Sequence, residues 1–575
     1  MSAARPPEGA QPPSLAEGGG TGREAGNPGG GYPVSIVPPP TAWTTGTTEV
    51  FKTGTWRALL PEYVARPSPC QQACPVNGDI AEWIAHARAG DLRRAWEVLV
   101  AHNPFPAIAG RICHHPCESA CNRAAWDAAV SVCRLERAAG DAAIAAGWAL
   151  PAAREERAGH VAIVGGGPSG LSAAYQLRRR GWRVSLYESR PRLGGLMRYG
   201  IPGYRLARDV LDAEIDRIVA LGVQVHCNAP LAAGELERLR ATHDAVYLAT
   251  GAAQPKALPK LPAAPWLLQG SDYLAALAEG AVPQVGARVL VVGGGSAAMD
   301  VARSARRAGC EVTILSLEPR EHMPAQQEEV LEALEEGIAL HDGAMVLGGA
   351  SGAAGVQLEC IRVRFEAGAP PRVTPLRGSE FTLAVDAVLQ AIGQEADLGL
   401  FPGLAAAQGV LAVDAAQATP APGVWAGGDL ASRARFVTQA VGMGKRAALD
   451  IDRALRGLPR GEGRASAAVA LDEIATWYHP HARRAPAQRL PLPERLAGNA
   501  EVQLPLTPVQ VHAEAQRCFS CGTCTHCDNC FQHCPDLAIT HVDGGYAVLA
   551  DYCKGCGICV RECPTGSMQL REELR

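Results

Sequence analysis

The distribution of cysteines constrains this chain more than any other feature of its sequence. Of 19 cysteines, 16 fall into two tracts, six within residues 70–133 and ten within residues 518–563. The long stretch between the tracts holds only Cys227, Cys310 and Cys360, which we expect to be buried single thiols. A secreted disulfide framework would be short and rich in cysteine throughout. Clustered cysteines in a long chain are instead typical of metal ligands.

Charge and hydropathy exclude two broad classes of partner. The 575-residue chain carries 54 basic and 58 acidic residues, a net charge of −4, and so lacks the basic surface of a nucleic-acid-binding protein. No stretch of about 18 uncharged apolar residues predicts a membrane span. The first 40 residues lack the basic and then apolar plan of a secretory leader. We therefore expect a cytoplasmic protein without a membrane span.

Two copies of one cysteine pattern, Cys-x2-Cys-x2-Cys-x3-Cys-Pro, lie near the C-terminus and begin at Cys524 and Cys553. This is the spacing of bacterial two-cluster ferredoxins, in which the fourth cysteine of each run binds the other cluster. A zinc ribbon would need only four cysteines in two pairs. The pattern therefore predicts two [4Fe–4S] clusters with crossed ligand sets. The first set is Cys524, Cys527, Cys530 and Cys563, and the second is Cys553, Cys556, Cys559 and Cys534.

A glycine-rich turn near residue 165 predicts a dinucleotide site. The apolar run Val161–Val164 leads into Gly165-Gly-Gly167-Pro-Ser-Gly170, and helix-forming residues follow. Glycines at these positions permit a tight turn and let a pyrophosphate approach the backbone N–H groups at a helix N-terminus. A second predicted strand ends at Glu188, where an acid can bind a ribose hydroxyl.

A second glycine-rich turn repeats this arrangement further along the chain. The strand Val289–Val292 is followed by Gly293-Gly-Gly295-Ser-Ala-Ala298 and another helical run, with alanine at the third position. Glu318 lies just past the end of the next predicted strand. Two such turns in one chain indicate two dinucleotides meeting face to face, a bound flavin and a nicotinamide.

These features together resemble the flavoprotein (small) subunit of glutamate synthase and the N-terminal half of dihydropyrimidine dehydrogenase, over about residues 60–455. Besides the turns, the resemblance rests on the motifs that begin at Gly194, Ala249 and Gly427. It implies FAD at the first turn, NAD(P)H at the second, and Asp429 near the flavin ribityl chain. The flavin would mediate the redox chemistry, so no catalytic side chain is expected. The candidate cofactor-binding residues, from the turns and the resemblance together, are Gly165, Gly167, Gly170, Glu188, Gly194, Gly195, Thr250, Gly251, Gly428, Asp429, Gly293, Gly295, Ala298 and Glu318.

The resemblance and the sequence texture together predict an α/β fold with two Rossmann-like dinucleotide-binding domains, one inserted in the other. An N-terminal α-helical iron–sulfur domain and a C-terminal two-cluster ferredoxin domain flank them. A Gly- and Pro-rich tail is expected to be disordered. The expected boundaries are 1–43 for the tail, 44–157 for the helical domain, 158–285 and 401–460 for the FAD domain, 286–400 for the NAD(H) domain, 461–516 for a linker, and 517–575 for the ferredoxin-like domain.

The second turn departs from the family at one place. Relatives that use NADPH have two arginines just after the second strand of the inserted domain, whereas this chain has Leu317 and Glu318. A carboxylate repels a 2′-phosphate but can accept hydrogen bonds from a free 2′-hydroxyl. We therefore expect NAD(H). The alternative is that Glu318 is an ordinary loop acid and Arg320 binds a phosphate.

The N-terminal cysteines follow the family only in part. Its members begin with a run of four cysteines, and here that run is reduced to two. By resemblance to dihydropyrimidine dehydrogenase, Cys74, Cys113 and Cys117 would share one cluster. Its fourth ligand would be either Glu136, which aligns with a glutamine ligand there, or Cys133, which lies one helical turn earlier. The whole tract consists of Cys70, Cys74, Cys113, Cys117, Cys121 and Cys133.

The remaining two cysteines of this tract, Cys70 and Cys121, would belong to a second cluster that lacks two ligands. Cys518-Phe-Ser-Cys521-Gly reads like the absent Cys-x2-Cys-Gly opening, displaced to the front of the ferredoxin domain. Sixteen clustered cysteines at four per cluster then give four clusters. The alternative is that Cys518 and Cys521 are leftovers and that three clusters remain.

The expected cofactors predict an electron-transfer subunit that exchanges electrons between NAD(H) and a partner catalytic subunit. A flavin converts two-electron hydride transfer into the one-electron transfer of iron–sulfur clusters. The segment from Asp551 to Cys559 resembles the ferredoxin subunit of 2-oxoacid:acceptor oxidoreductases. This resemblance implies a thiamine-diphosphate-dependent partner of the phenylglyoxylate dehydrogenase type, with NAD+ as the final acceptor.

Two other functions stay open. In the first, electrons run from NADH to a reductase or to free ferredoxin. In the second, the chain is a non-catalytic iron–sulfur scaffold with vestigial nucleotide sites. The intact glycine-rich turns and Asp429 argue against the scaffold.

Overall fold

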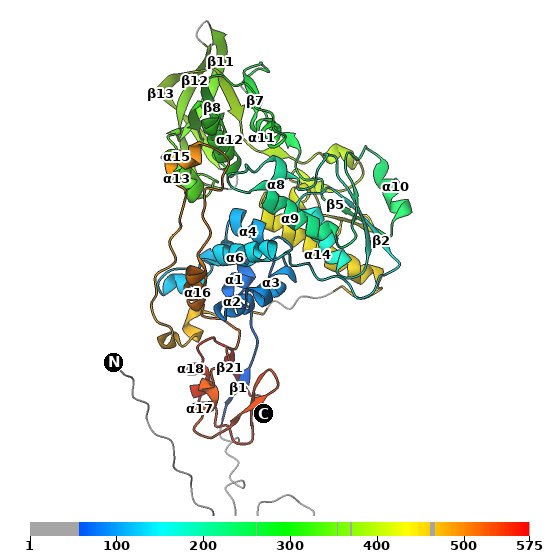
Figure 1. Ribbon diagram of the computed structural model, residues 1–575, viewed down its shortest axis with the longest axis vertical. Coiled ribbons are helices and arrows are strands. Elements are labelled where there is room, and N and C mark those ends of the chain that lie inside the picture. The colour runs from blue at the N-terminus through cyan, green and yellow to red at the C-terminus, as the bar shows by residue number, and fades with distance from the viewer. Residues whose placement is uncertain (1–56, 260, 353–354, 369–370, 461–465, 574–575) are drawn as a thin grey trace, which may run out of the picture.

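The computed structural model describes residues 57–573 except 260, 353–354, 369–370 and 461–465. The tail expected to be disordered, residues 1–43, lies outside the described residues. A bundle of helices lies at the centre of the molecule, between two α/β units and a small cysteine-rich domain formed mainly by the end of the chain (Figure 1).

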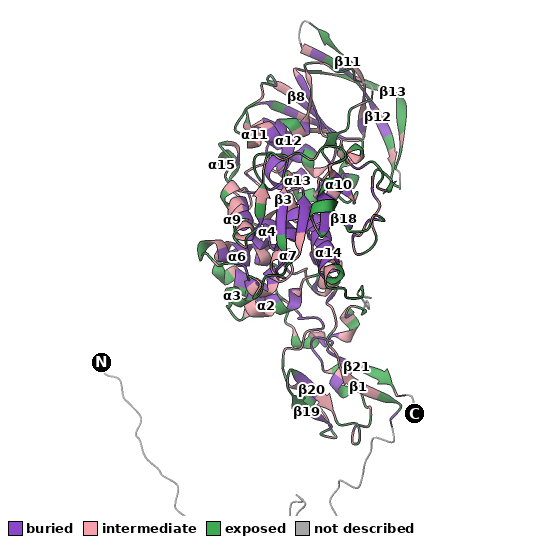
Figure 2. Ribbon diagram, turned by 90° about the vertical axis from the view of Figure 1, so that its right-hand side faces the viewer, coloured by how far each residue is buried: buried purple, intermediate pink, exposed green. Residues whose placement is uncertain are grey.

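The first α/β unit is built on a parallel sheet with the strand order β18-β5-β2-β3-β4. Its strands are β2 (His160–Val164), β3 (Arg183–Tyr187), β4 (Gln224–His226), β5 (Ala245–Leu248) and β18 (Val424–Ala426). All four residues of β5 are buried, as expected of a parallel strand covered on both faces. Figure 2 shows the strands of this sheet around β3 and β18 mostly in the purple of buried residues. Its helices are α7 (Pro168–Arg178), α8 (Leu196–Tyr199), α9 (Arg208–Val219), α10 (Glu235–Thr242) and α14 (Val437–Leu455).

The second α/β unit lies between β5 and β18 in the chain, so it is inserted in the first. Its parallel sheet has the order β10-β9-β8-β14-β7, and an antiparallel sheet of order β11-β12-β13 packs beside it. The parallel strands are β7 (Leu267–Gln269), β8 (Arg288–Val292), β9 (Glu311–Leu315), β10 (Ala339–His341) and β14 (Ala387–Gln390). The others are β11 (Ala344–Gly352), β12 (Gly355–Glu366) and β13 (Arg372–Val385), and the helices are α11 (Gly270–Ala278), α12 (Ser296–Arg307) and α13 (Gln327–Glu335).

The inserted unit begins earlier than the expected boundary at residue 286. Strand β7 pairs with β14, so it belongs to the second sheet, and α11 follows it directly. The passage between the units is marked by the short pair β6 (Gln254–Pro255) and β15 (Gln394–Glu395). Because β7 is only three residues long and half-buried, it has no recognisable sequence period.

The central bundle is held together by buried aromatic and aliphatic side chains. Trp83 of α2 and Trp96 of α3 are both almost fully buried, and α4 packs along α6. These helices carry the N-terminal cysteines at or near their ends, which fixes the cysteines on a rigid support. The helices are α1 (Pro69–Ala73), α2 (Ile80–Arg88), α3 (Leu92–Val100), α4 (Pro106–Ile112), α5 (Pro116–Ser119) and α6 (Val132–Ala145).

The C-terminal domain includes a strand from the N-terminal part of the chain. Strand β1 (Leu59–Tyr63) pairs antiparallel with β21 (Met568–Glu572), and Arg57 donates hydrogen bonds to the carbonyls of Ala550 and Cys553. The expected boundaries, which assigned residues 44–157 to one domain, are therefore wrong for this strand. The other elements of this domain are α17 (Asn529–Gln532), β19 (Ile539–Val542), β20 (Gly545–Val548) and α18 (Ile558–Arg561).

The described part of the expected linker wraps around the other domains and includes the α-helices α15 (Leu492–Leu496) and α16 (Pro508–Gln516). A capping box at Thr507 starts α16, whose buried residues join the core of the helical bundle. Near α15 the linker is tied to the inserted unit by an ion pair between Arg495 and Glu335 (2.7 Å). In Figure 1 it runs from α15, beside α13, back to α16. The helical period of α16 is short, and the sequence pattern did not reveal it.

No helix within the described ranges is both long and apolar enough to cross a membrane.

Candidate functional site

The first glycine-rich turn leads from β2 into α7 and leaves open space where a pyrophosphate would lie. A Cβ added to Gly165 would be 2.2 Å from the carbonyl oxygen of Ala249, and one added to Gly170 would be 1.9 Å from the oxygen of Gly165. At Gly167, which caps α7, the nearest atom would be 3.8 Å away. Close backbone packing on one side and open space on the other fit a bound dinucleotide.

Glu188, directly after β3, is held against this turn. Its carboxylate accepts hydrogen bonds from the backbone N–H groups of Gly166 and Arg190, both at 2.8 Å. The Gly194–Gly195 pair lies on the same turn, because the Gly194 N–H donates to the Gly166 carbonyl at 2.8 Å. The structure thus brings the expected ribose ligand and the second glycine pair to one edge of the sheet.

Two further segments complete this cradle. Thr250 and Gly251 follow β5, whose last carbonyl accepts a hydrogen bond from the Gly427 N–H at 2.9 Å. A Cβ on Gly428 would be 3.0 Å from the side chain of Ser169 in α7. Burial raises the pKa of Asp429, whose carboxylate lies 3.7 Å from the guanidinium of Arg435. These segments meet at the carboxyl ends of the parallel strands, where open α/β sheets bind ligands.

The second glycine-rich turn connects β8 to α12 in the same way. A Cβ on Gly293 would be 2.4 Å from the Ala391 carbonyl oxygen, whereas at Gly295 no atom would lie within 4 Å. Ala298 is fully buried and donates its backbone N–H to the Gly295 carbonyl at 2.9 Å. The open Gly295 at the N-terminus of α12 fits a second dinucleotide.

Glu318 lies beside this second turn. Its carboxylate accepts a hydrogen bond from the Ser316 hydroxyl at 2.7 Å, and a Cβ on Gly294 would be 2.6 Å from the same carboxylate. Arg320 is exposed on the following turn. The acid is therefore the charged group nearest to the second glycine of the turn.

The C-terminal cysteines gather into the two expected sets. Cys524, Cys527, Cys530 and Cys563 line one cavity. The other four interact electrostatically, because Cys534, Cys553 and Cys556 all act on the thiol of Cys559, whose pKa burial raises to about 12. No group of three or more His, Cys, Asp or Glu side chains in the described part of the chain is arranged for a single metal ion. Four thiols around a cavity fit the larger cubane of a [4Fe–4S] cluster.

Three N-terminal cysteines form a set next to the FAD cradle. Cys74 ends α1, Cys113 ends α4, and both thiols act electrostatically on that of Cys117 in α5. The Cys113 thiol lies 3.6 Å from the Thr438 hydroxyl at the start of α14. A Cβ on Gly442 of α14 would be 2.1 Å from the Pro75 carbonyl oxygen, so this helix packs directly on the Cys74 loop.

Glu136 and Cys133 differ in their position relative to this set. Apart from burial, the Glu136 carboxylate is the strongest influence on the thiol pKa of both Cys74 and Cys113, and it accepts a hydrogen bond from Asn103 at 2.8 Å. Burial raises the pKa of Glu136 to about 7. The Cys133 thiol also interacts electrostatically with Cys113, Cys117 and Glu136, but it donates a hydrogen bond to the Ala109 carbonyl at 3.4 Å and lines a cavity between α6, α13 and the linker.

The last four clustered cysteines come from opposite ends of the chain. Cys70, Cys121, Cys518 and Cys521 line one cavity between the helical bundle and the C-terminal domain. The structure thus brings together all four residues of the set that the spacing argument joined.

Three side chains near the cysteine sets had no sequence signal. Tyr63 of β1 lines the cavity of Cys524 and hydrogen-bonds its thiol. Thr438 contacts Cys113, and the Asn122 amide donates to the Cys521 thiol at 3.5 Å. Each of these contacts joins distant segments of the chain, including that of Asn122, which follows Cys121 but donates to Cys521. A local spacing rule cannot find such contacts.

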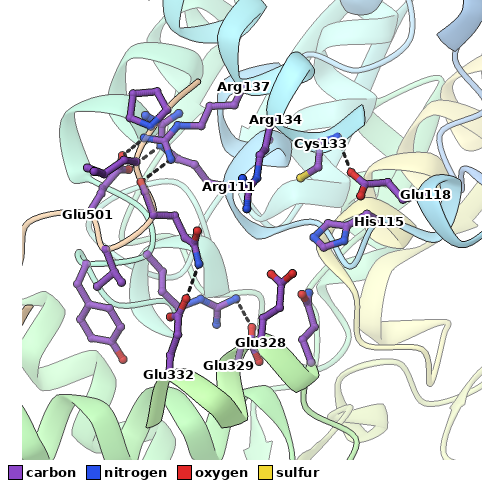
Figure 3. Close-up of a pocket in the computed structure, with 18 of the residues that line it drawn as sticks. Arg111, His115, Glu118, Cys133, Arg134, Arg137, Glu328, Glu329, Glu332 and Glu501 are labelled. Carbon is purple, nitrogen blue, oxygen red and sulfur yellow. Dashed lines mark hydrogen bonds and ion pairs between the residues drawn. The ribbon is translucent and has the colours of Figure 1, made fainter. Parts of the chain in front are cut away.

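A larger cavity, drawn in Figure 3, lies where the linker, α6 and α13 meet. Its charged side chains pair with one another: Glu501 accepts from Arg111 at 2.6 Å and from Arg137 at 2.8 Å. Neither glycine-rich turn lines it. These ion pairs hold the linker to the helical bundle at this junction.

Comparison with known proteins gives the family. Residues 159–444 match the family model described as pyridine nucleotide-disulphide oxidoreductase, and residues 64–148 match dihydropyrimidine dehydrogenase domain II, a 4Fe–4S cluster domain. Residues 546–569 match a 4Fe–4S binding domain. The small chain of glutamate synthase [NADPH] from Azospirillum brasilense is 35% identical over 408 residues, which cover 66% of this chain and 84% of that one. The chain belongs to the family of this small chain.

Other members of the family are named as subunits of different oxidoreductases. The beta subunit of the NADP(+)-dependent formate dehydrogenase of Moorella thermoacetica is 34% identical over 507 residues, 79% of this chain and 70% of that subunit. The PreT subunit of the NAD-dependent dihydropyrimidine dehydrogenase of Escherichia coli K12 is 33% identical over 404 residues, 68% of this chain and 92% of PreT. The chain is thus an oxidoreductase of a family that uses FAD, a pyridine nucleotide and 4Fe–4S clusters.

Proposed function

We propose that this chain exchanges electrons between NAD(H), through FAD and its iron–sulfur clusters, and a separate catalytic subunit. The observation that carries the proposal is the contact between Cys113 and Thr438, which sets one cysteine group directly against the FAD cradle. From there the cysteine sets continue through the helical bundle to Cys527 and Cys556, which are exposed at the far end of the molecule. Electrons thus have a continuous series of sites from the nucleotide units to the surface.

In the part of the FAD domain that the structure describes, no pair of cysteines could accept electrons as a dithiol. Within the matched range 159–444, as far as the structure describes it, Cys227, Cys310 and Cys360 are free thiols, and they lie in separate elements. A bound flavin supplies the conversion between two-electron and one-electron transfer. The cysteine set beside α14 is therefore the nearest acceptor that this chain provides.

For the clusters we propose the ligand sets that the structure brings together. Each ferredoxin cluster takes three cysteines of one run and the fourth of the other. The cluster beside FAD takes Cys74, Cys113, Cys117 and the Glu136 carboxylate. The reason is that, of the charged groups around them, Glu136 acts most strongly on the thiols of Cys74 and Cys113. Cys133 is left outside the set.

We further propose a cytoplasmic complex in which the catalytic subunit is a thiamine-diphosphate-dependent 2-oxoacid oxidoreductase. The support is the resemblance of residues 551–559 to the ferredoxin subunit of such enzymes, together with relatives that are themselves named as subunits. The exposure of Cys556, in this same segment, also supports an outermost cluster that a partner can reach.

The test is isolation of the intact complex under anaerobic conditions. We expect copurified subunits, bound thiamine diphosphate, and 2-oxoacid-dependent reduction of NAD+. NADH-dependent cluster reduction without 2-oxoacid activity would favour the reverse function, the delivery of electrons from NADH to a reductase. If NADH reduces neither a dye nor the clusters of a fully loaded sample, the chain is a scaffold and the proposal is wrong.

A further inference from the structure

We propose that Cys70, Cys121, Cys518 and Cys521 hold one [4Fe–4S] cluster, which is shared between the N-terminal helical bundle and the segment before the C-terminal domain. The proposal rests on the cluster content given under the proposed function. Two of the four cysteines, Cys518 and Cys521, lie outside both 4Fe–4S matches, which cover residues 64–148 and 546–569.

The walls of the cavity between these cysteines suit a cluster. Apolar side chains of Ile84, Val130 and Phe519 line it together with the four thiols. The thiols of Cys518 and Cys121 are both close enough to act electrostatically on that of Cys70. Four thiolates around one cavity can each bind one corner of a cubane.

The local backbone at Cys518 matches that of the ferredoxin loops. In each case the residue two places after the cysteine has a positive φ, 53° at Ser520, 53° at His526 and 71° at Gly555. The N–H of that residue then donates to the preceding thiol, at 3.4 Å in all three loops. Two of these loops belong to cysteine runs with ferredoxin spacing. Residues other than glycine seldom adopt a positive φ, so this conformation at Ser520 points to the same role for Cys518.

A buried network fixes the two ends of the chain around the cavity. Arg123, two residues after Cys121, donates a hydrogen bond to the Arg517 carbonyl at 2.5 Å and forms an ion pair with Asp127 at 2.6 Å. Arg517 pairs with the same Asp127 at 2.9 Å and with Glu514 at 2.7 Å. Both arginines are almost fully buried. Burying two guanidinium groups is costly unless the pairs form, so the network holds Cys518 in place.

The shared site lies between the other cysteine sets. Cys70 and Cys74 stand at either end of the single-turn helix α1, and residues four apart on a helix are neighbours at about 6 Å. On the other side, Gly522 donates its N–H to the Thr565 carbonyl at 2.6 Å, two residues beyond Cys563. A cluster here therefore relays electrons from the ferredoxin clusters to the cluster beside FAD.

The test compares iron content in two double variants and their combination, each made in the full-length chain. Cys70→Ala with Cys121→Ala, and Cys518→Ala with Cys521→Ala, should each lose about four iron atoms per chain, because two thiolates do not hold a cubane. The quadruple variant should lose the same four. Cys310→Ala with Cys360→Ala is the matched control, and it should lose none because these buried thiols lie in the inserted unit.

Two separate sites would predict a different result. In that case the quadruple variant would lose the sum of the two double variants, about eight iron atoms, and the shared cluster would be excluded. No loss from the Cys518 and Cys521 variant would exclude it as well. If that variant does not fold, Cys518→Ser with Cys521→Ser, which keeps the size of both side chains, takes its place in the same comparison.

A further readout separates this inference from the proposed function. NADH-dependent dye reduction at the flavin should persist in both double variants, whereas NADH should no longer reduce the ferredoxin clusters, as followed by electron paramagnetic resonance. Absence of NADH-dependent dye reduction in the unmodified chain would contradict the proposed function rather than the shared cluster. Unchanged reduction of the ferredoxin clusters in a variant that has lost four irons would overturn the relay.

Discussion

We expect Glu318 to be the residue through which the second glycine-rich turn distinguishes the two nicotinamide dinucleotides. Its carboxylate lies beside Gly294, where a 2′-phosphate would meet a like charge. We expect a higher kcat/KM for NADH than for NADPH. Glu318→Arg should lower the ratio of kcat/KM for NADH to kcat/KM for NADPH by about tenfold or more, because it replaces repulsion of the 2′-phosphate by a charge-assisted contact.

Dye reduction with each nucleotide measures this preference. Glu321→Arg is the control, since it introduces the same charge at an exposed acid a few residues away. A native protein that uses NADPH more efficiently than NADH would contradict the assignment of Glu318.

Glu136 and Cys133 make a second prediction for single residues. Glu136→Ala should lower the iron content by up to about four atoms per chain, because it removes the proposed fourth ligand beside Cys74. Cys133→Ala should leave the iron content unchanged, since its thiol faces the cavity of Figure 3. Glu136→Gln, which keeps an oxygen atom in place, should retain more iron than the alanine variant. The opposite ranking of Glu136 and Cys133 would show that the cysteine is the ligand.

The choice between these two residues shows the limit of sequence reasoning at this scale. Both lie on α6, three residues apart, and spacing alone favours neither. The difference arises from contacts with other segments. Asn103 donates a hydrogen bond to the Glu136 carboxylate, whereas the Ala109 carbonyl accepts one from the Cys133 thiol. The ferredoxin cysteines needed no such help, since three ligands of each set lie within seven residues of one run.

Helix α16 offers a test of how one element anchors the end of the chain. Val511 is buried against the helical bundle, whereas Val509 on the same helix is 80% exposed. Val511→Asp should lower the free energy of unfolding by about 3 kcal/mol or more, because it buries an unpaired charge. Val509→Asp should have almost no effect. Thermal unfolding and limited proteolysis near residue 516 measure both, and equal effects of the two substitutions would mean that α16 is not docked.

At the scale of elements, the sequence predicted what is local and missed what depends on distant pairing. Both strand–turn–helix units were visible because each combines an apolar run, glycines and a helix within about 20 residues. Strand β7 was assigned to the wrong unit, since only its pairing with β14 reveals its sheet. Likewise, nothing within Leu59–Tyr63 indicates that it pairs with a strand at the opposite end of the chain.

The molecule as a whole separates the nucleotide units from the exposed clusters, and this separation can be tested. Cys556→Ala should lower the iron content by up to about four atoms per chain but leave NADH-dependent dye reduction intact, because the flavin cradle lies beyond the helical bundle. Electron exchange with the partner subunit should fall sharply in the same variant. Loss of the dye reaction in a well-folded sample would mean that the proposed order of cofactors is wrong.

The pairing of β1 with β21 also bears on how the chain is made. Tyr63 leaves the ribosome about 500 residues before its partner Met568, which at about 5–20 residues per second is an interval of roughly 25–100 s. During that time the strand Leu59–Tyr63 is an open edge, which other chains can pair with. A nascent chain that stops short of residue 568 never closes this edge. Synthesis of residues 568–572 therefore closes an edge that residues 59–63 leave open from the start of translation.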